Sequence, residues 1–131
     1  MNTTTKPTKK ILIVEDDADT RRALNIRLRS HEYETAFAGD AISAVTVARN
    51  EAPDLILLDL GLPGGDGFLL MERFETLPEL SSVPVVVLTG RDEHPNKRRA
   101  EALGAKAFFQ KPADNEQLLS RISTILENDE A

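Results

Sequence analysis

The chain has 131 residues, of which 40% are hydrophobic and 29% charged, and this ordinary globular composition excludes disordered, collagen-like and membrane-spanning classes. Its length corresponds to one domain with a core of its own. The absence of cysteine excludes a disulfide framework and a thiolate metal site. A net charge of −6 argues against direct binding to nucleic acid, because that affinity comes from many Lys and Arg contacts to phosphate.

The N-terminal segment MNTTTKPTKK is polar and lacks the apolar h-region of a signal peptide. Apolar runs elsewhere are far shorter than the roughly 20 residues that a membrane-spanning helix needs. We therefore expect a cytoplasmic protein that does not act at a membrane. The expected organisation is a flexible tail over residues 1–9, one folded domain over residues 10–127, and a short tail over residues 128–131.

Five strand-like runs alternate along the chain with segments of helical spacing. In chain order the runs are KILIV (10–14), YETAFA (33–38), DLILLD (54–59), VPVVVLT (83–89) and KAFFQ (106–110). Three residues mark helix ends in this pattern: Asp66 is placed to cap the third helix, Pro95 to open the fourth and Gly104 to close it. The clearest helix is the last, where five apolar residues recur on one face: Leu118, Leu119, Ile122, Ile125 and Leu126.

This alternation predicts an α/β fold, a doubly wound (βα)5 sandwich of three layers with helices on both faces of a five-stranded parallel sheet. The runs ILIV, LILL and VVVL are continuously apolar, which is typical of parallel strands buried on both faces. In such folds ligands bind beyond the carboxyl ends of the strands. The residues that follow each strand are therefore the candidates for function.

Polar side chains end or follow four of the five runs. They are Glu15, Asp16 and Asp17 after the first run, Asp59 at the end of the third, Thr89 at the end of the fourth and Lys111 after the fifth. Because these positions share one edge of a parallel sheet, the carboxylates repel one another unless a cation lies among them. Carboxylate and carbonyl oxygens without His or Cys suit Mg²⁺ or Mn²⁺.

Each of these residues also has a purely structural interpretation. A strand-end aspartate such as Asp59 can cap the next helix, although Asp66 is better placed for that. The acidic turn over residues 15–17 can be solvated or can cap the first helix, and Asp17 is assigned to such a structural role. Phe108 and Phe109 are adjacent aromatics in a strand, where core packing is the default.

Taken together, four motifs resemble the receiver (response regulator) domain of two-component signal transduction, the family typified by the bacterial chemotaxis response regulator. The motifs are VEDD, DLGLPGGDG, LTG and FFQKP, and the resemblance extends from about Lys10 to Leu126. It implies the flavodoxin-like strand order 2-1-3-4-5. It also implies that Asp59 is the phosphoacceptor, that Asp16, Asp59 and the Gly61 carbonyl ligate the divalent cation, and that Glu15 acts through water.

The same resemblance assigns three further residues. Thr89 would hydrogen-bond the phosphoryl group, and Lys111 would pair with it. Phe108 would be the aromatic residue that moves, together with Thr89, in the conformational switch. The peptide between Lys111 and Pro112 would be cis, a geometry that costs little only before proline.

The implied function is phosphoryl acceptance from a histidine kinase or histidine phosphotransfer protein. Phosphorylation would switch the surface of the fourth helix, fifth strand and fifth helix, which would control a downstream effector protein or domain. Such a domain is not a classical enzyme, since it catalyses only its own phosphorylation and dephosphorylation. Two alternatives remain open: a pseudo-receiver that serves as a protein interaction module, and a haloacid-dehalogenase-like phosphotransferase, whose nucleophile would be expected on the first strand.

Overall fold

The computed structural model describes residues 8–129, which form a five-stranded parallel sheet in the order β2-β1-β3-β4-β5. The strands are β1 (Lys10–Val14), β2 (Glu34–Ala38), β3 (Leu55–Leu58), β4 (Val85–Thr89) and β5 (Ala107–Gln110). The predicted fold class and strand order are therefore confirmed.

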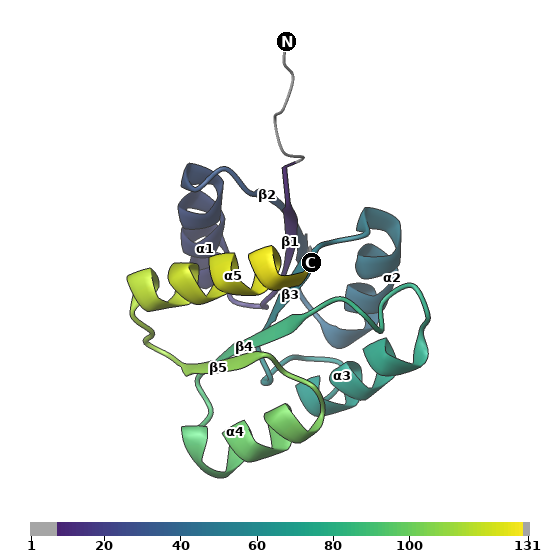
Figure 1. The fold of residues 1–131 in the computed structure, drawn as a ribbon. Coiled ribbons are helices and arrows are strands. Elements are labelled where there is room, and N and C mark those ends of the chain that lie inside the picture. The colour runs from purple at the N-terminus through teal and green to yellow at the C-terminus, as the bar shows by residue number, and fades with distance from the viewer. Residues whose placement is uncertain (1–7, 130–131) are drawn as a thin grey trace.

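Five helices cover the two faces of the sheet (Figure 1). They are α1 (Ala18–Ser30), α2 (Ala41–Glu51), α3 (Gly67–Thr76), α4 (Glu93–Ala102) and α5 (Asn115–Asp129). Helices α1 and α5 pack on one face, where Leu24, Leu28 and Ile122 join the core. Helices α2, α3 and α4 pack on the other, where Phe68 and Ala100 contribute. The sheet is thus the middle of three layers.

The central strands are buried on both faces because every residue in them is apolar or lies at the end of a strand. In β1, Ile11 and Ile13 point into the core beneath α1 and α5, whereas Leu12 and Val14 point into the opposite core. This alternation is the period of two that a pleated strand imposes. It explains why the sequence shows continuous apolar runs rather than alternating ones.

Strand β1 begins at Lys10 as predicted, and the other four strands begin one or two residues later than the sequence pattern predicted. For β4 the cause is Pro84, which accepts a hydrogen bond from the Ile56 N–H at 2.9 Å but has no N–H to donate to the sheet. Strand β3 ends at Leu58, so Asp59 is the first residue beyond the strand. Because Asp59 lies outside the strand, the alternation of side chains between the two faces of the sheet does not fix the direction of its carboxyl group.

The predicted helix ends are confirmed. Asp66 caps α3, and its Oδ1 accepts the Phe68 N–H at 2.8 Å. In α4 the backbone of His94 is not helical, so the regular turns begin at Pro95. Gly104 follows α4 with φ +101°, a conformation that glycine adopts at little cost. Asp17 caps α1 by accepting the Thr20 N–H at 2.9 Å.

The structure describes one predicted end of the domain fully and the N-terminal tail only in part. Helix α5 continues to Asp129, two residues beyond the predicted end of the domain. Most of the predicted N-terminal tail, residues 1–7, lies outside the described residues. In the part of the chain from residue 8 to 129, no helix combines the length and the apolar character required to cross a membrane.

Candidate functional site

Three polar side chains are buried among residues 8–129, and all three belong to the predicted site. Glu15 is 2% exposed, Asp59 8% and Thr89 0%. They follow or end β1, β3 and β4, three neighbouring strands whose carboxyl ends share one edge. Buried polar groups need partners, and buried charges need partners of opposite sign. The buried charged side chains among the described residues therefore lie together at the carboxyl ends of the strands.

The acidic residues of this edge lie close together. Glu15, Asp16 and Asp59 each place a carboxylate oxygen within 4.8 Å of the others, and Asp16 is the exposed member. The predicted convergence of the first and third strand ends is thus confirmed. Hard oxygen donors in this arrangement fit Mg²⁺ or Mn²⁺ in their chemistry, because these ions prefer carboxylate and carbonyl ligands.

Lys111 joins the two buried carboxylates. Its Nζ donates to Glu15 Oε1 at 2.6 Å and to Asp59 Oδ2 at 3.2 Å. Burial alone would lower the pKa of Lys111, but its hydrogen bond to Glu15 and the charges of Asp59 and Glu15 outweigh burial and raise it. Lys111 consequently remains an ammonium ion at neutral pH.

The pKa of the Glu15 carboxyl group lies above its ordinary value. Burial raises its pKa, and the charge of Asp59 raises it further. Hydrogen bonds from Lys111 and from the Asp17 N–H, 3.1 Å from Glu15 Oε2, act in the opposite direction without cancelling the rise. Burial of Glu15 thus disfavours its charged form more than its hydrogen bonds favour it.

The loop after β3 fixes the orientation of Asp59. Its Oδ1 accepts the Gly61 N–H at 3.1 Å, which leaves Oδ2 facing Lys111. The loop itself is held against α3, where the Gly67 N–H donates to the Leu60 carbonyl at 3.1 Å. A Cβ at Gly67 would lie 2.6 Å from the Leu60 Cα, so only glycine permits this approach.

Thr89 and Phe108 occupy neighbouring strands near the same edge. The Thr89 Oγ1 accepts the Arg91 N–H at 3.3 Å, and the Thr89 carbonyl accepts the Lys111 N–H at 2.8 Å. Phe108 is 8% exposed and packs into the core beneath α2, α3 and α4. The predicted cis peptide between Lys111 and Pro112 is confirmed. The roles of Thr89 and Phe108 in a switch stay predictions.

One contributor to the site was not predicted. Arg21 of α1 donates from Nη1 to the Glu15 carbonyl at 3.0 Å, so it supports the backbone that carries the acidic pair. The sequence held no signal for this, because Arg21 and Arg22 are adjacent and identical in type. Which of the two arginines reaches Glu15 depends on how α1 is rotated about its own axis against the sheet.

The strand order and the charged edge define the class: a flavodoxin-like α/β domain with its functional groups at the carboxyl ends of β1, β3 and β5. The chain belongs to the response regulator receiver domain family, whose model matches residues 11–123. It is therefore a receiver domain of the kind found in two-component systems.

The chain is similar to known proteins in both sequence and structure. The chain is 32% identical over 117 residues to protein PilH of Pseudomonas aeruginosa, a match that covers 89% of this chain and 97% of PilH. A putative response regulator from Chloroflexus aurantiacus has a TM-score of 0.87 at 29% identity, covering 92% of this chain and 99% of that one. The receiver domain of the sensor histidine kinase PA1611 from P. aeruginosa, with a magnesium ion coordinated in its active site cleft, has a TM-score of 0.79 at 26% identity and coverages of 93% and 97%.

Other curated relatives are longer than this chain. It spans 26% of one response regulator and 52% of another, each at 33% or 34% identity. What those whole proteins do is consequently a property of more than the matched domain.

Proposed function

We propose that Asp59 accepts a phosphoryl group from the phosphohistidine of a histidine kinase or histidine phosphotransfer protein, in a reaction that depends on Mg²⁺ or Mn²⁺. The observation that carries this proposal is the buried contact between Asp59 and Lys111, with 3.2 Å between Oδ2 and Nζ. A helix-capping aspartate binds backbone N–H groups, as Asp66 does. An aspartate paired with an ammonium group beside two further carboxylates is suited to a phosphoryl group instead.

The chemistry is a transfer between two nucleophiles. One carboxylate oxygen of Asp59 forms a bond to phosphorus while the bond from phosphorus to the donor imidazole breaks. The imidazole keeps the electron pair of that bond and takes up a proton. Lys111 lies where negative charge arrives, so its ammonium group stabilises the phosphoryl oxygens during and after transfer.

The metal ligands we propose are the carboxylates of Asp16 and Asp59 and the backbone carbonyl of Gly61, with Glu15 acting through water. A divalent cation bound there would neutralise charge on the phosphoryl group. The charges of the site support this set, because within residues 8–129 the three clustered carboxylates have one ammonium partner, Lys111, which bonds to Glu15 and Asp59.

The output we propose is a change in the surface formed by α4, β5 and α5. A phosphoryl group on Asp59 offers new acceptors to the Thr89 hydroxyl, and Phe108 lies on the strand next to Thr89. Movement of Thr89 toward the phosphoryl group would alter the packing around Phe108. Hydrogen exchange on the phosphorylated and free forms tests this: we expect changed protection within residues 90–125, and unchanged protection there would contradict the switch.

The biological setting we propose is cytoplasmic signalling. The domain acts on a downstream effector protein or domain rather than on an external substrate, and it does not itself contact nucleic acid or a membrane. Its similarity to the similarly sized PilH and to parts of longer regulators supports either a separate or a fused effector.

The experiment for the central proposal is intact-mass spectrometry after incubation with acetyl phosphate and Mg²⁺. We expect one added phosphoryl group on the wild-type chain, and no adduct after chelation or in Asp59→Asn. The matched control is Asp54→Asn, since Asp54 lies just before β3, at the opposite end of the strand from Asp59. No adduct on the wild-type chain would favour the pseudo-receiver, and an adduct that persists in Asp59→Asn would assign the chemistry elsewhere.

A further inference from the structure

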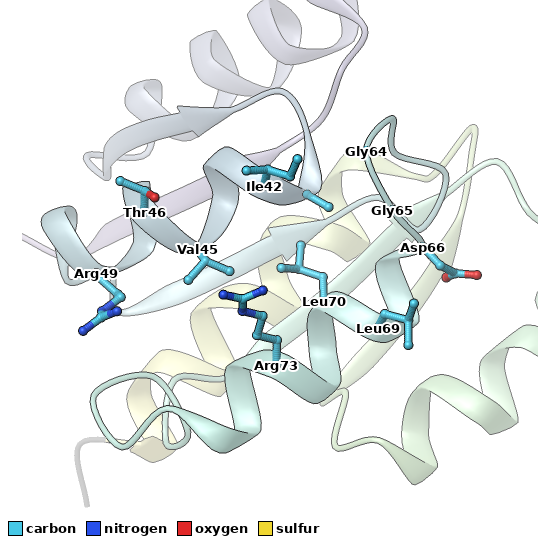
Figure 2. A pocket seen from close by; sticks show the side chains of 11 residues that line it. Ile42, Val45, Thr46, Arg49, Gly64, Gly65, Asp66, Leu69, Leu70 and Arg73 are labelled. Atoms are coloured by element: carbon cyan, nitrogen blue, oxygen red, sulfur yellow. The ribbon is translucent and has the colours of Figure 1, made fainter.

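A groove with a volume of about 370 Å³ lies between α2 and α3, away from the α4, β5 and α5 surface (Figure 2). Its base includes Val45 and Leu70, which are buried. The loop that follows Asp59 closes one end of the groove with Gly64 and Gly65. This loop is bonded to the start of α2, where the Ala41 N–H donates to the Pro63 carbonyl at 3.2 Å.

The end of the groove nearest that loop is mainly apolar, and its one carboxylate among the described residues, Asp66, pairs with Arg91 at 3.8 Å. Ile42 of α2 is 75% exposed and Leu69 of α3 is 60% exposed, and both line the groove. They are two of four large apolar side chains exposed among residues 8–129. Two such side chains on facing helices, above an apolar floor, form a surface that a partner can desolvate favourably.

The other end of the groove is basic. Arg49 lies seven residues after Ile42 on α2, and Arg73 lies four residues after Leu69 on α3. Figure 2 shows the Arg73 side chain extending from α3 toward α2 and Arg49. Arg49 pairs with Glu79 at 2.8 Å, but the Arg73 guanidinium has no ion pair within the described residues 8–129. A cation is thus held at the groove without a compensating carboxylate.

The parallel course of the two helices produces this polarity. Both α2 and α3 follow strands of one parallel sheet and pack on the same face, so their N-terminal ends lie together and their C-terminal ends lie together. On α2 the seven residues from Ile42 to Arg49 span about 10 Å at the helical rise per residue, whereas on α3 the four residues from Leu69 to Arg73 span about 6 Å. The apolar and basic positions are thus one to two turns apart for a helix that lies along the groove.

We propose that the α2–α3 groove is a second docking surface, which binds an amphipathic acidic helix of a partner protein. The helix would place apolar side chains over Ile42 and Leu69 and a carboxylate about one turn away against Arg73. A second carboxylate about two turns away would reach Arg49, where it would compete with Glu79. Charge complementarity selects this occupant. The chain as a whole carries a net charge of −6 and repels acidic partners, yet this groove offers an unpaired arginine. The inference goes beyond phosphoryl acceptance and does not depend on it.

The probe for the test is a designed, fluorescein-labelled helical peptide. One face of it carries two leucines at one end, a glutamate about one turn further along and a second glutamate about two turns further along. A control peptide has lysines in place of the glutamates. Binding to the unphosphorylated full chain is followed by anisotropy and by amide chemical-shift mapping. We expect shift changes concentrated in residues 41–49 and 64–73. The lysine peptide should bind at least about tenfold more weakly.

Substitutions in the groove test which residues contact the peptide. Leu69→Asp and Arg73→Glu should each weaken binding of the glutamate peptide by about tenfold. Ile26→Asp and Arg29→Glu on α1 are the matched controls, since Ile26 is also exposed and both lie outside the groove. They should leave binding unchanged. Thermal melts of all variants verify folding, and Asp59→Asn should bind the peptide like the wild type, which separates this test from that of phosphoryl transfer.

Three outcomes would overturn the proposal. The first is no binding of the glutamate peptide up to about 1 mM, a weak affinity even for a transient contact. The second is binding that Arg73→Glu leaves unchanged, or shifts that map to α1 or α4. The third is concentration-dependent self-association that Leu69→Asp abolishes, which would assign the groove to a second copy of the chain.

Discussion

Two kinds of carboxylate lie near the functional edge: the caps of helices, and the acidic pocket in which Glu15, Asp16 and Asp59 lie close together beside Lys111. Asp17, Asp40 and Asp66 cap helices and accept backbone N–H groups at their N-terminal ends. For Asp40, hydrogen bonds from the Ser43 N–H and side chain lower the pKa. Burial instead raises the pKa of Glu15, which lies in the pocket beside Asp59. Hydrogen bonds at a helix start thus favour the charged form of Asp40, whereas burial disfavours the charged form of Glu15.

The difference lies in what each negative charge faces. A capping carboxylate meets the unpaired N–H groups and the positive end of the helix dipole, and it remains partly hydrated. Glu15 and Asp59 have lost water and face one another, with Lys111 as their shared partner. The caps therefore stabilise the starts of their helices, whereas the pocket carboxylates have the surroundings that the proposed binding of a cation and a phosphoryl group requires.

The largest expected effect on stability comes from removing the pocket's cation. Lys111→Met should lower the free energy of unfolding by about 2 kcal/mol, because it leaves two buried carboxylates without their partner. Urea denaturation at neutral pH with a chelator measures this. Lys97→Met is the control, because Lys97 pairs with Glu93 on the exposed side of α4 and its loss should cost less than about 0.5 kcal/mol. Equal losses in the two variants would remove the distinction between pocket and surface.

A capping residue should show the next largest effect. Asp66→Ala should lower the free energy of unfolding by about 1 kcal/mol, because the Phe68 N–H loses its acceptor at the start of α3. Asp66→Asn keeps a side-chain oxygen and should retain most of the stability. Thermal or urea denaturation compares the three proteins. A loss in Asp66→Asn as large as that in Asp66→Ala would mean that the charge, rather than the hydrogen bond, stabilises the helix.

Removing a pocket carboxylate should have the opposite sign. Asp59→Asn should raise the free energy of unfolding in the absence of metal by up to about 1 kcal/mol, because Glu15 loses a repulsive neighbour and Lys111 still pairs with Glu15. The asparagine oxygen can still accept the Gly61 N–H. Urea denaturation with a chelator tests this, and a clear destabilisation would show that the Asp59 charge supports the fold.

The smallest expected effect is a pH dependence at a cap. The folded-state pKa of Asp40 lies below its ordinary value of 3.8, so its stabilisation is present above that value and is lost as pH falls through the folded-state pKa. Asp40→Asn can keep the hydrogen bond to Ser43 but does not titrate. The difference in stability between the wild type and this variant should therefore change at acidic pH. A constant difference from neutral pH to about pH 3 would contradict the assignment.

The fold and most of the pocket were predictable from the sequence for physical reasons. Continuous apolar runs such as LILL identify strands buried on two faces, and parallel strands bring their following residues to one edge. Helix rotation was not predictable in the same way. Leu69 and Leu70 are adjacent and equally apolar, yet Leu70 is buried while Leu69 lines the groove above it. The spacing of Leu70 to Phe74 places Leu70 on the apolar face of α3, but the pattern does not predict that Leu69 lines a groove shared with α2.

The pairing of Lys111 with Glu15 shows a second limit of prediction from the sequence. These residues are 96 positions apart, and the sequence predicted only that both would lie at the same edge. That the ammonium group binds both carboxylates depends on side-chain reach across the neighbouring strands. The resemblance to a family identified Lys111 as important, whereas its two hydrogen bonds emerged only from the structure.

The strand order β2-β1-β3-β4-β5 also has a consequence for how the chain acquires its shape during synthesis. β2 is added to one side of β1, and then β3, β4 and β5 are added in turn to the other side. No strand has to be inserted between two that are already paired. The sheet can therefore assemble in the order in which the ribosome releases its strands, each new strand meeting an open edge that is already present.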